Sequence, residues 1–478
     1  MDSVNDFLSR ASGLVWGGEI WGGYDFFGIL IPLLLGTGLY LTFRLSAIQF
    51  RTLGRALRLG LLKRKDPQGE GDITHYEALT TALAATVGVG NIAGVAGAIY
   101  LGGPGALFWM WITGLVGMAT KYCEAFLGVK FRHTDAAGEQ SGGPQTYLTR
   151  GIKGRLGPIL GVTFAVFAIL ASFGIGNMTQ SNTVASTADD SWGVPTWLTG
   201  LILTVAAAAV ILGGIKVIGR VTAAFVPLMI VIYLLAGTWV LLANVGELPD
   251  AIELIFTDAF TGTSAVGGFL GAGFLLALRY GVARGIFSNE SGLGTGGIAA
   301  AAAKTTHPVR QALVSMTQTF IDTIVVVTFT GLVIVVTGAW QSGRDGAPMT
   351  SLAFQDGLPG GWGDNVVALS VAFFAFSTLL GWSYYGERNV ERLVGRVGVM
   401  PYRAVFVVVV FVGAVTELET VWTFSDVMNG LMALPNLIGL LILAGLVARE
   451  TREYLNSPEG MMLKEPRRGR GPEEEDKV

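Results

Sequence analysis

Two glycine-containing stretches lie in the middle of apolar segments and offer polar backbone groups that could bind a ligand. TVGVGN at residues 86–91 interrupts the apolar segment 77–101, and RGIFSNESGLG at residues 284–294 interrupts the segment 267–302. Each segment can cross a bilayer, since about 20 helical residues span a hydrocarbon core of roughly 30 Å. Glycine in a helix costs about 1 kcal/mol relative to alanine, so both stretches are expected to unwind. Unwound backbone at this depth needs polar partners, which predicts that the two breaks line a binding cavity.

The composition assigns the chain to the polytopic membrane proteins. Of 478 residues, 51% are hydrophobic and only 14% charged, with a mean hydropathy of +0.56, whereas soluble domains carry about 25% charged residues. The single cysteine, Cys123, excludes an internal disulfide, and His75, His133 and His307 are too scattered to indicate a metal-ligand cluster. The sequence contains no G-x-x-x-x-G-K-[ST] loop. We therefore expect neither ATP nor a nucleic acid as a partner.

Lysine and arginine alternate between the loops in a pattern that predicts eleven transmembrane helices. Cytoplasmic loops are enriched in these residues, so the basic loop that follows the first span should be inside. This places the N-terminus outside and the C-terminus in the cytoplasm. The predicted spans are 26–43, 77–101, 106–129, 159–178, 196–212, 221–242, 267–302, 313–337, 366–385, 402–415 and 424–447.

After the first helix, the spans form two blocks of five, and each block opens with a glycine-broken helix. Because five is odd, the second block starts from the opposite side of the membrane, as in secondary transporters that bind their substrate near the midplane. We predict an all-α polytopic membrane protein with about eleven transmembrane helices, two of them broken, in which an inverted repeat follows one extra helix. The predicted units are an extracellular or interfacial segment at 1–25, the extra helix at 26–45, five-helix repeats at 77–243 and 267–447, and a charged cytoplasmic tail at 448–478.

Many segments, in the same order along the chain, are familiar. They include TALAATVGVGNIAGVA (81–96), GMATKYCEA (117–125), FGIGNMTQSN (173–182), RGIFSNESGLG (284–294) and FSTLLGWSYYGE (376–387). Through them the chain resembles the alanine or glycine:cation symporter family, the sodium:alanine symporters. The resemblance implies a leucine-transporter-like fold and sodium-driven uptake of alanine or glycine.

The first break is expected to bind the substrate carboxylate, because the N-terminus of a half-helix offers free N–H groups and a favourable dipole. The alternative is that its glycines only permit close helix packing. By the same resemblance, oxygens near this break bind substrate or Na⁺, the co-transported ion. The residues concerned are Thr86, Gly88, Val89, Gly90 and Asn91 for substrate, and Ala84, Val87, Asn91, Phe374, Ser377 and Thr378 for Na⁺.

Three further spans are expected to contribute to the site. In the second break, carbonyls of Phe287, Ser288 and Asn289 would accept from the substrate ammonium. Thr378 and Trp382 lie one turn apart on a helix expected to face the first break, where Trp382 either walls the pocket or belongs to an interfacial aromatic belt. The hydroxyls of that helix either bind the cation or bond their own backbone. In the fourth span, Phe173, Asn177 and Gln180 either line the site or cap the helix end.

Ionisable residues at membrane depth are costly, so each is expected to have a partner. We predict that Arg284 and Glu290 form a structural or gating ion pair or reach a polar cavity. Other deep charges are expected to be interhelical partners or gates, although one carboxylate could carry a coupling proton. These are Lys121, Glu124, Asp322 and Asp426.

The chain departs from the family at two positions of the first broken span, and after Gly294, where the family often has a Ser-Ala-Pro-like stretch and this chain has Thr295-Gly296-Gly297. Val89 stands where the family usually has threonine, and Glu77 where it commonly has glutamine. The loss of one hydroxyl is worth only about 0.5–1.5 kcal/mol, so binding should survive while selectivity changes. Glu77, near the inner end of its span, could alter the choice of ion.

Taken together, these features predict a secondary transporter, not an enzyme, which imports a small neutral amino acid with Na⁺ by alternating access. The alternatives are H⁺-coupled symport and an amino-acid sensor without flux. A channel lacks a recognisable filter, and an intramembrane enzyme would need a metal motif or a deep histidine base. We expect a multi-pass protein of the plasma (inner) membrane whose partners are alanine or glycine and the lipid bilayer, and whose sequence is compatible with a monomer.

Overall fold

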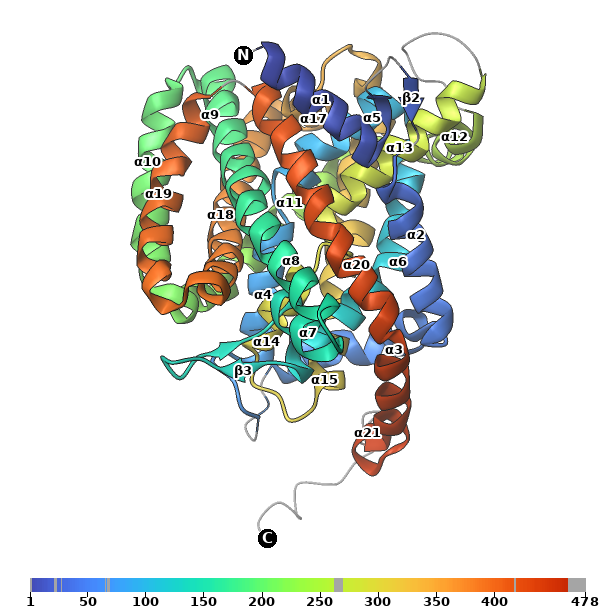
Figure 1. Ribbon diagram of the computed structural model, residues 1–478. Helices are drawn as coiled ribbons and strands as arrows, with labels where there is room; N and C mark the ends of the chain where they lie inside the picture. Colours follow the sequence, from blue (N-terminus) through green and yellow to red (C-terminus); the bar gives the residue numbers. More distant parts are fainter. Residues whose placement is uncertain are drawn as a thin grey trace, which may run out of the picture.

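The computed structural model describes residues 2–20, 24–26, 28–64, 66, 69–261, 270–416 and 418–462. Helices dominate these residues and run mostly along one axis of the molecule (Figure 1). Two short antiparallel hairpins interrupt the helical pattern, β1 (Gly18–Ile20) with β2 (Tyr24–Phe26) and β3 (His133–Thr134) with β4 (Gln140–Ser141). The prediction of an all-α polytopic protein is confirmed, and within the described part of the chain the strands are confined to these two hairpins.

The first half of the chain holds the first broken span. Its π-helical turns are η1 and η3, and its 3₁₀ turn is η2. The elements are α1 (Asp2–Trp16), α2 (Leu30–Arg44), α3 (Ile48–Leu57), η1 (Arg58–Lys63), α4 (His75–Thr86), η2 (Val89–Asn91), α5 (Ala93–Gly102), α6 (Ala106–Lys130), α7 (Pro144–Gly151), α8 (Leu156–Phe173), η3 (Gly174–Met178), α9 (Thr179–Trp192), α10 (Thr196–Ile211), α11 (Gly214–Ala243) and α12 (Leu248–Thr261).

The second half holds the second broken span, α13 with α14. A π-helical segment, η4, joins α15 to α16, and three short 3₁₀ turns lie in connections. The elements are α13 (Leu270–Asn289), α14 (Thr295–Ala301), α15 (Pro308–Thr319), η4 (Phe320–Val327), α16 (Thr328–Val336), η5 (Ala339–Gln341), α17 (Gly346–Gly357), η6 (Pro359–Gly361), α18 (Gly363–Val394), η7 (Arg396–Gly398), α19 (Val399–Val415), α20 (Leu418–Asn456) and α21 (Pro458–Met462).

Six helical stretches among the described residues are long and apolar enough to cross a membrane, or seven if the bent pair 30–44 and 48–63 counts as one span. The two broken spans and the short α10 are not counted, because the criterion requires one continuous apolar helix of at least 18 residues. Several boundaries differ from the prediction. The first span begins at Leu30 because residues 24–26 form β2, the fourth runs continuously from Leu156 to Trp192, and α20 continues to Asn456, into the predicted tail. Residues 463–478 of that tail lie outside the described residues.

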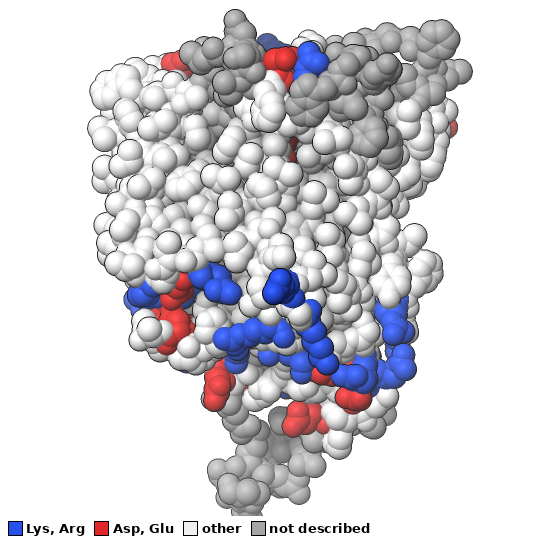
Figure 2. Space-filling model, in the orientation of Figure 1, with Lys and Arg blue, Asp and Glu red and all other residues white. Residues whose placement is uncertain are grey.

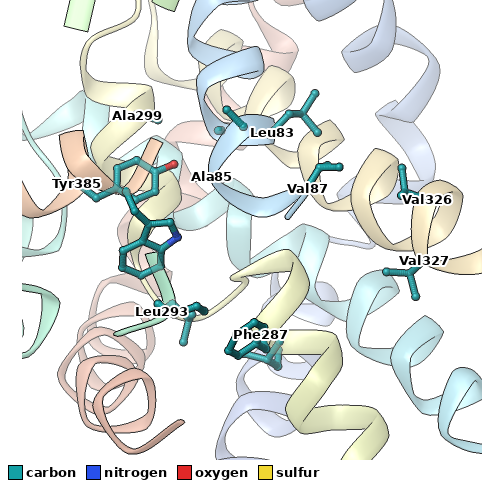
Figure 3. Packing of buried hydrophobic residues seen from close by; sticks show 14 of the residues in the cluster. Leu83, Ala85, Val87, Phe287, Leu293, Ala299, Val326, Val327 and Tyr385 are labelled. Carbon is teal, nitrogen blue, oxygen red and sulfur yellow. The ribbon is translucent and has the colours of Figure 1, made fainter. Parts of the chain in front are cut away.

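The distribution of side chains matches a membrane-embedded protein. Large apolar side chains such as Ile159, Leu201 and Val408 are exposed on peripheral helices, where lipid would cover them. The middle of the molecule shows almost no charged side chain on the face in Figure 2, and Lys and Arg gather at one end, which we call the basic end. The interior is a continuous apolar core that surrounds both breaks, with Val87 in the first break, Leu293 in the second and Phe287 near the end of α13 (Figure 3).

Candidate functional site

The first break lies between α4 and α5, and side chains satisfy its freed amides. Asn91 Oδ1 accepts a hydrogen bond of 2.9 Å from the Gly88 N–H, and Gln180 Oε1 from α9 accepts one of 3.1 Å from the Val89 N–H. A Cβ atom on Gly88 would lie 2.4 Å from Thr378 Oγ1. Glycine is therefore required here for the close approach of α18 to the unwound backbone.

Oxygens from α4 and α18 converge beside this break. Ser377 Oγ lies 3.3 Å from the Ala84 carbonyl oxygen and 3.4 Å from that of Val87. Thr378 Oγ1 lies 3.0 Å from the Ala84 oxygen, and both hydroxyls also contact the Phe374 carbonyl oxygen, at 2.8 and 3.1 Å. These neutral oxygens at the negative end of α4 are the donor type that coordinates Na⁺ in broken-helix transporters.

Asn91, the sixth predicted cation ligand, is directed instead toward a buried carboxylate. Its Nδ2 donates to Asp322 Oδ1 at 2.8 Å, and Ser288 of α13 donates to Asp322 Oδ2 at 2.9 Å. Thr323 donates to the same oxygen at 2.8 Å. Asp322, in the π-helical segment η4, thus joins the first break to the end of α13 through the Asn91 amide and the Ser288 hydroxyl.

The second break is shorter than predicted and lies at residues 290–294. Arg284 to Asn289 are the last turns of α13, so Phe287, Ser288 and Asn289 are helical, not unwound. The Asn289 carbonyl accepts from Gln318 Nε2 at 3.2 Å. Glu290 adopts a left-handed backbone conformation with φ of 57°, which ends the helix.

A carboxylate and an ammonium from α6 hold this second break. Glu124 Oε1 accepts from the N–H groups of Gly292 and Gly294, both at 2.9 Å, at the positive N-terminal end of α14. Lys121 Nζ donates to the Glu290 carbonyl oxygen at 3.0 Å and lies 3.7 Å from Glu124 Oε2. The two deep charges of α6 therefore pair with each other while satisfying freed backbone groups.

Trp382 is buried, with 1% exposure, so it does not belong to an interfacial belt. Its Nε1 donates to Glu290 Oε1 at 2.6 Å, and Thr295 donates to Glu290 Oε2 at 2.6 Å. A Cβ atom on Gly176 would lie 2.2 Å from Trp382 Cβ. The indole is thus fixed between the second break and η3.

Arg284 does not pair with Glu290, contrary to one form of the prediction. Its guanidinium binds Asp426 of α20 through two hydrogen bonds of 2.9 Å. It also lies over the ring of Trp422, 4.9 Å from the centroid, and Trp422 stacks on Phe287 at 5.0 Å. Since a Cβ on Gly90 would lie 3.1 Å from Phe287, this ion pair and aromatic stack cover one side of the first break.

The fourth-span residues divide between two faces. Gln180 reaches the first break, but Asn177 donates to the Phe406 carbonyl oxygen of α19 at 2.8 Å, and the Phe173 ring packs on Tyr402 and Phe406. The π-helical turn η3 separates them because its extra residue rotates the helix face. Neither side chain caps a helix end, since the helix continues to Trp192.

Two other predicted residues are bonded within their own helix. Thr86 Oγ1 donates to the Ala82 and Leu83 carbonyl oxygens at 3.0 and 3.3 Å. Glu77 accepts from the Thr74 N–H at 2.7 Å and forms a capping box at the start of α4. The side chain of Val89 is fully buried.

An ion network closes the basic end around Arg388, which is fully buried. Arg388 contacts Asp135 and Glu139 of the β3–β4 connection at 3.2 and 3.1 Å and Glu387 at 2.6 Å. Burial would raise the pKa of Asp135, but backbone N–H groups, first that of Glu139, and the Arg388 charge bring it below its ordinary value. Charge-assisted hydrogen bonds from one guanidinium to several carboxylates are strong, so this network stabilises the contact between α18 and the hairpin.

A second set of contacts at the basic end joins the two broken spans. Arg132, just after α6, donates to the carbonyl oxygens of Ala301 and Ala303 at 3.1 and 2.7 Å and to that of Glu70 at 2.8 Å. Backbone bridges pair Glu70 with Thr305 and Ile73 with Ala303. The segment before α4 is thereby tied to the segment after α14.

Comparison with known families matches residues 5–466 to the sodium:alanine symporter family. The chain belongs to this family. It is 51% identical over 440 residues to the sodium/alanine symporter AgcS of Methanococcus maripaludis, covering 91% of this chain and 95% of that protein. It is 36% identical to the probable sodium/glutamine symporter GlnT of Bacillus subtilis, covering 89% and 87%. Membership makes the chain a membrane transporter of the symporter class and not an enzyme.

Solved structures support the fold of this family member. The crystal structure of MhsT in complex with L-phenylalanine superposes with a TM-score of 0.59 at 13% identity, covering 82% of this chain and 95% of that one. At this identity the similarity concerns the fold alone. The leucine-transporter-like fold expected from the resemblance is thus confirmed.

Some residues that organise the site were not singled out by the sequence for these roles. The sequence placed Asp426 among the deep charges without identifying Arg284 as its partner, and it did not single out Arg388. Four acidic residues close in sequence to basic loops, at 135, 139, 387 and 391, were the available signal for the Arg388 network. Arg132 had no distinguishing sequence signal.

Proposed function

We propose that this symporter imports a small neutral amino acid, alanine or glycine, together with Na⁺ by alternating access. The observation that carries the proposal is the convergence of the Ser377 and Thr378 hydroxyls on the carbonyls of Ala84, Val87 and Phe374. These oxygens lie where an unwound helix meets α18, so a Na⁺ ion bound there would tie the position of α18 to that of the break.

The amino acid would bind next to this cation in the first break. Its carboxylate would face the N-terminus of α5, where the first amides lack intrahelical partners. The ammonium would face the C-terminal carbonyls of α13. The similarity to sodium:alanine symporters supports alanine or glycine over a bulky residue.

Closure at both ends supports alternating access. The Arg284–Asp426 pair covers the site on one side, and the networks of Arg388 and Arg132 close the basic end. We propose that the basic end is cytoplasmic, that the N-terminus is outside, and that the two five-helix repeats at 77–243 and 267–447 move relative to each other. Each closure would then act as a gate that opens in turn.

The driving force suffices for accumulation. One Na⁺ ion that crosses about 100 mV releases about 2.3 kcal/mol, and a tenfold concentration gradient adds about 1.4 kcal/mol. With one ion per zwitterionic substrate, the two terms support an accumulation of several hundredfold.

The test is uptake of labelled alanine and glycine into proteoliposomes with an inward Na⁺ gradient, an inward H⁺ gradient or no gradient. Accumulation above equilibrium with Na⁺ alone is expected. Accumulation with H⁺ alone would identify a proton symporter, and amino-acid binding without flux under any gradient would identify a sensor. Either outcome would contradict the proposal. Competition by larger amino acids, including glutamine, tests the substrate size.

A further inference from the structure

A basic pocket lies at the elbow between the first span and the helix that follows it. The chain turns by 81° between α2 and the α3–η1 helix, through Ser46 and Ala47, which both have left-handed backbone conformations. The end of α20 faces this elbow and completes a pocket of about 330 Å³. That volume is within the range of small-molecule sites, which is about 300–1,000 Å³.

The pocket is strongly positive. Arg44, Arg51 and Arg55 line it from the elbow and Arg452 from α20, and the lining residues include neither aspartate nor glutamate. Glu450, nearby on α20, is paired with Lys130 at 2.8 Å. Planar guanidinium groups match phosphate oxygens in geometry and charge. The pocket is therefore suited to a phosphate-bearing anion.

The surface beside the pocket is apolar and exposed. Phe43, next to Arg44 on α2, is 74% exposed, and Ile442 on α20 is 50% exposed. Ile442 precedes the pocket residue Ala448 by six residues, or about 9 Å along the helix. The helices α2 and α20 contact each other and run side by side toward the basic end (Figure 1). A soluble phosphate would use the arginines alone, whereas a phospholipid would also cover these apolar side chains.

We propose that this pocket binds the phosphate of an anionic phospholipid headgroup, with the acyl chains lying along α2 and α20. The site involves neither break and does not depend on the identity of the transported substrate. Basic pockets between transmembrane helices at the cytoplasmic side bind anionic lipid headgroups in other membrane proteins. Each arginine near such a headgroup contributes about fivefold to affinity.

The experiment measures binding of fluorescently labelled phosphatidylglycerol to the detergent-solubilised full chain by fluorescence anisotropy. Unlabelled phosphatidylglycerol should compete, whereas phosphatidylcholine should compete at least tenfold more weakly. R51Q/R55Q should weaken binding by about tenfold or more. The matched control is R58Q/R449Q, which removes two arginines of the same region that do not line the pocket and should change binding by less than twofold.

Two outcomes would overturn the proposal. Equal losses in both double variants would mean that only the general basic surface attracts the lipid. Competition by glycerol 3-phosphate at the concentration at which phosphatidylglycerol competes would mean that the site takes a soluble anion. If R51Q/R55Q does not give a monodisperse protein, the single variant R452Q, on a different helix, must lower affinity by about fivefold.

Discussion

The indole Nε1 of Trp382 donates a 2.6 Å hydrogen bond to the carboxylate of Glu290, which links α18 to the second break. The preceding turn of α18 carries Thr378, whose hydroxyl contacts the Ala84 carbonyl at the end of α4 and lies beside Gly88 of the first break. One helix therefore contacts both unwound segments within about 6 Å along its axis, as four residues rise by that distance. A change at either break has a direct route to the other through α18.

Trp382→Phe should lower the rate of uptake by tenfold or more while leaving the protein folded. The variant keeps an aromatic ring but leaves one Glu290 oxygen without its donor, and a hydrogen bond to a charged group is worth about 1.5–3 kcal/mol. The measurement is initial Na⁺-driven uptake, with monodispersity as the folding control. Trp340→Phe, a change of a half-buried tryptophan outside the site, is the matched control. Unchanged uptake in W382F would show that the Glu290 contact plays no part in transport.

Ser377→Ala and Thr378→Ala should each raise the Na⁺ concentration for half-maximal uptake by about tenfold, equivalent to about 1.4 kcal/mol. Each removes one hydroxyl oxygen from the proposed cation site, and the amino-acid affinity at saturating Na⁺ should change much less. Ser383→Ala is the control, since Ser383 is also buried on α18 but donates to the Leu380 carbonyl of its own helix. An equal effect of S383A would mean that loss of any buried hydroxyl on α18 disturbs transport.

Gly88→Ala should abolish uptake, because the added methyl would lie 2.4 Å from Thr378 Oγ1 and 3.1 Å from Gln180 Oε1. The break and α18 would have to separate, which would disperse the converging oxygens. Gly36→Ala in α2 is the matched control, since a Cβ there meets nothing within 4 Å, the residue lies outside the proposed site, and alanine favours the helix by about 1 kcal/mol. The measurements are the uptake and the thermal stability of both variants. Transport by G88A near the normal rate would show that close packing of α18 on the first break is not required for uptake.

The sequence predicted the two breaks, because glycine near a polar residue in an apolar segment is a local signal, and it named the oxygens of Ala84, Val87, Phe374, Ser377 and Thr378 that converge beside the first break. It placed the second break too early because it could not distinguish a packing glycine from an unwinding one. Gly285 is of the packing kind, since a Cβ there would lie 2.3 Å from Thr113 Oγ1 of α6. The orientation of Asn177 depends on the π-helical turn η3, which no local sequence pattern predicts. The partnership of Arg284 with Asp426 spans 142 residues and depends on tertiary packing.

Arg284→Gln should stop uptake while the protein still binds substrate. The bidentate pair with Asp426 covers one side of the proposed site, and its loss leaves a half-buried carboxylate without its cation. Asp426→Asn should have the same effect, and the exchanged variant R284D/D426R should recover part of the activity if attraction between the two positions is what closes the site. Arg279→Gln on the same helix is the control. Normal uptake by R284Q would exclude a gating role for this ion pair.

The connection at the basic end should make stability depend on pH through Asp66. Asp66 lies 3.0 Å from Arg310 Nε and accepts from the Thr306 N–H and hydroxyl at 3.2 and 3.0 Å. Burial raises the pKa of Asp66, but these hydrogen bonds and the Arg310 charge outweigh burial and lower it overall.

A carboxyl whose pKa is lower in the folded state stabilises the fold above its unfolded pKa of about 4. This contribution disappears as the pH falls through the folded pKa. Asp66→Asn should therefore lower the melting temperature at pH 7, and this effect should shrink as the pH falls below the unfolded pKa of about 4. Thermal unfolding in detergent from pH 7 into the acid range measures it. Asp356→Asn, which changes an exposed carboxyl, should leave the profile unchanged, and a D66N profile parallel to that of the unmodified protein would show that Asp66 does not provide this stability.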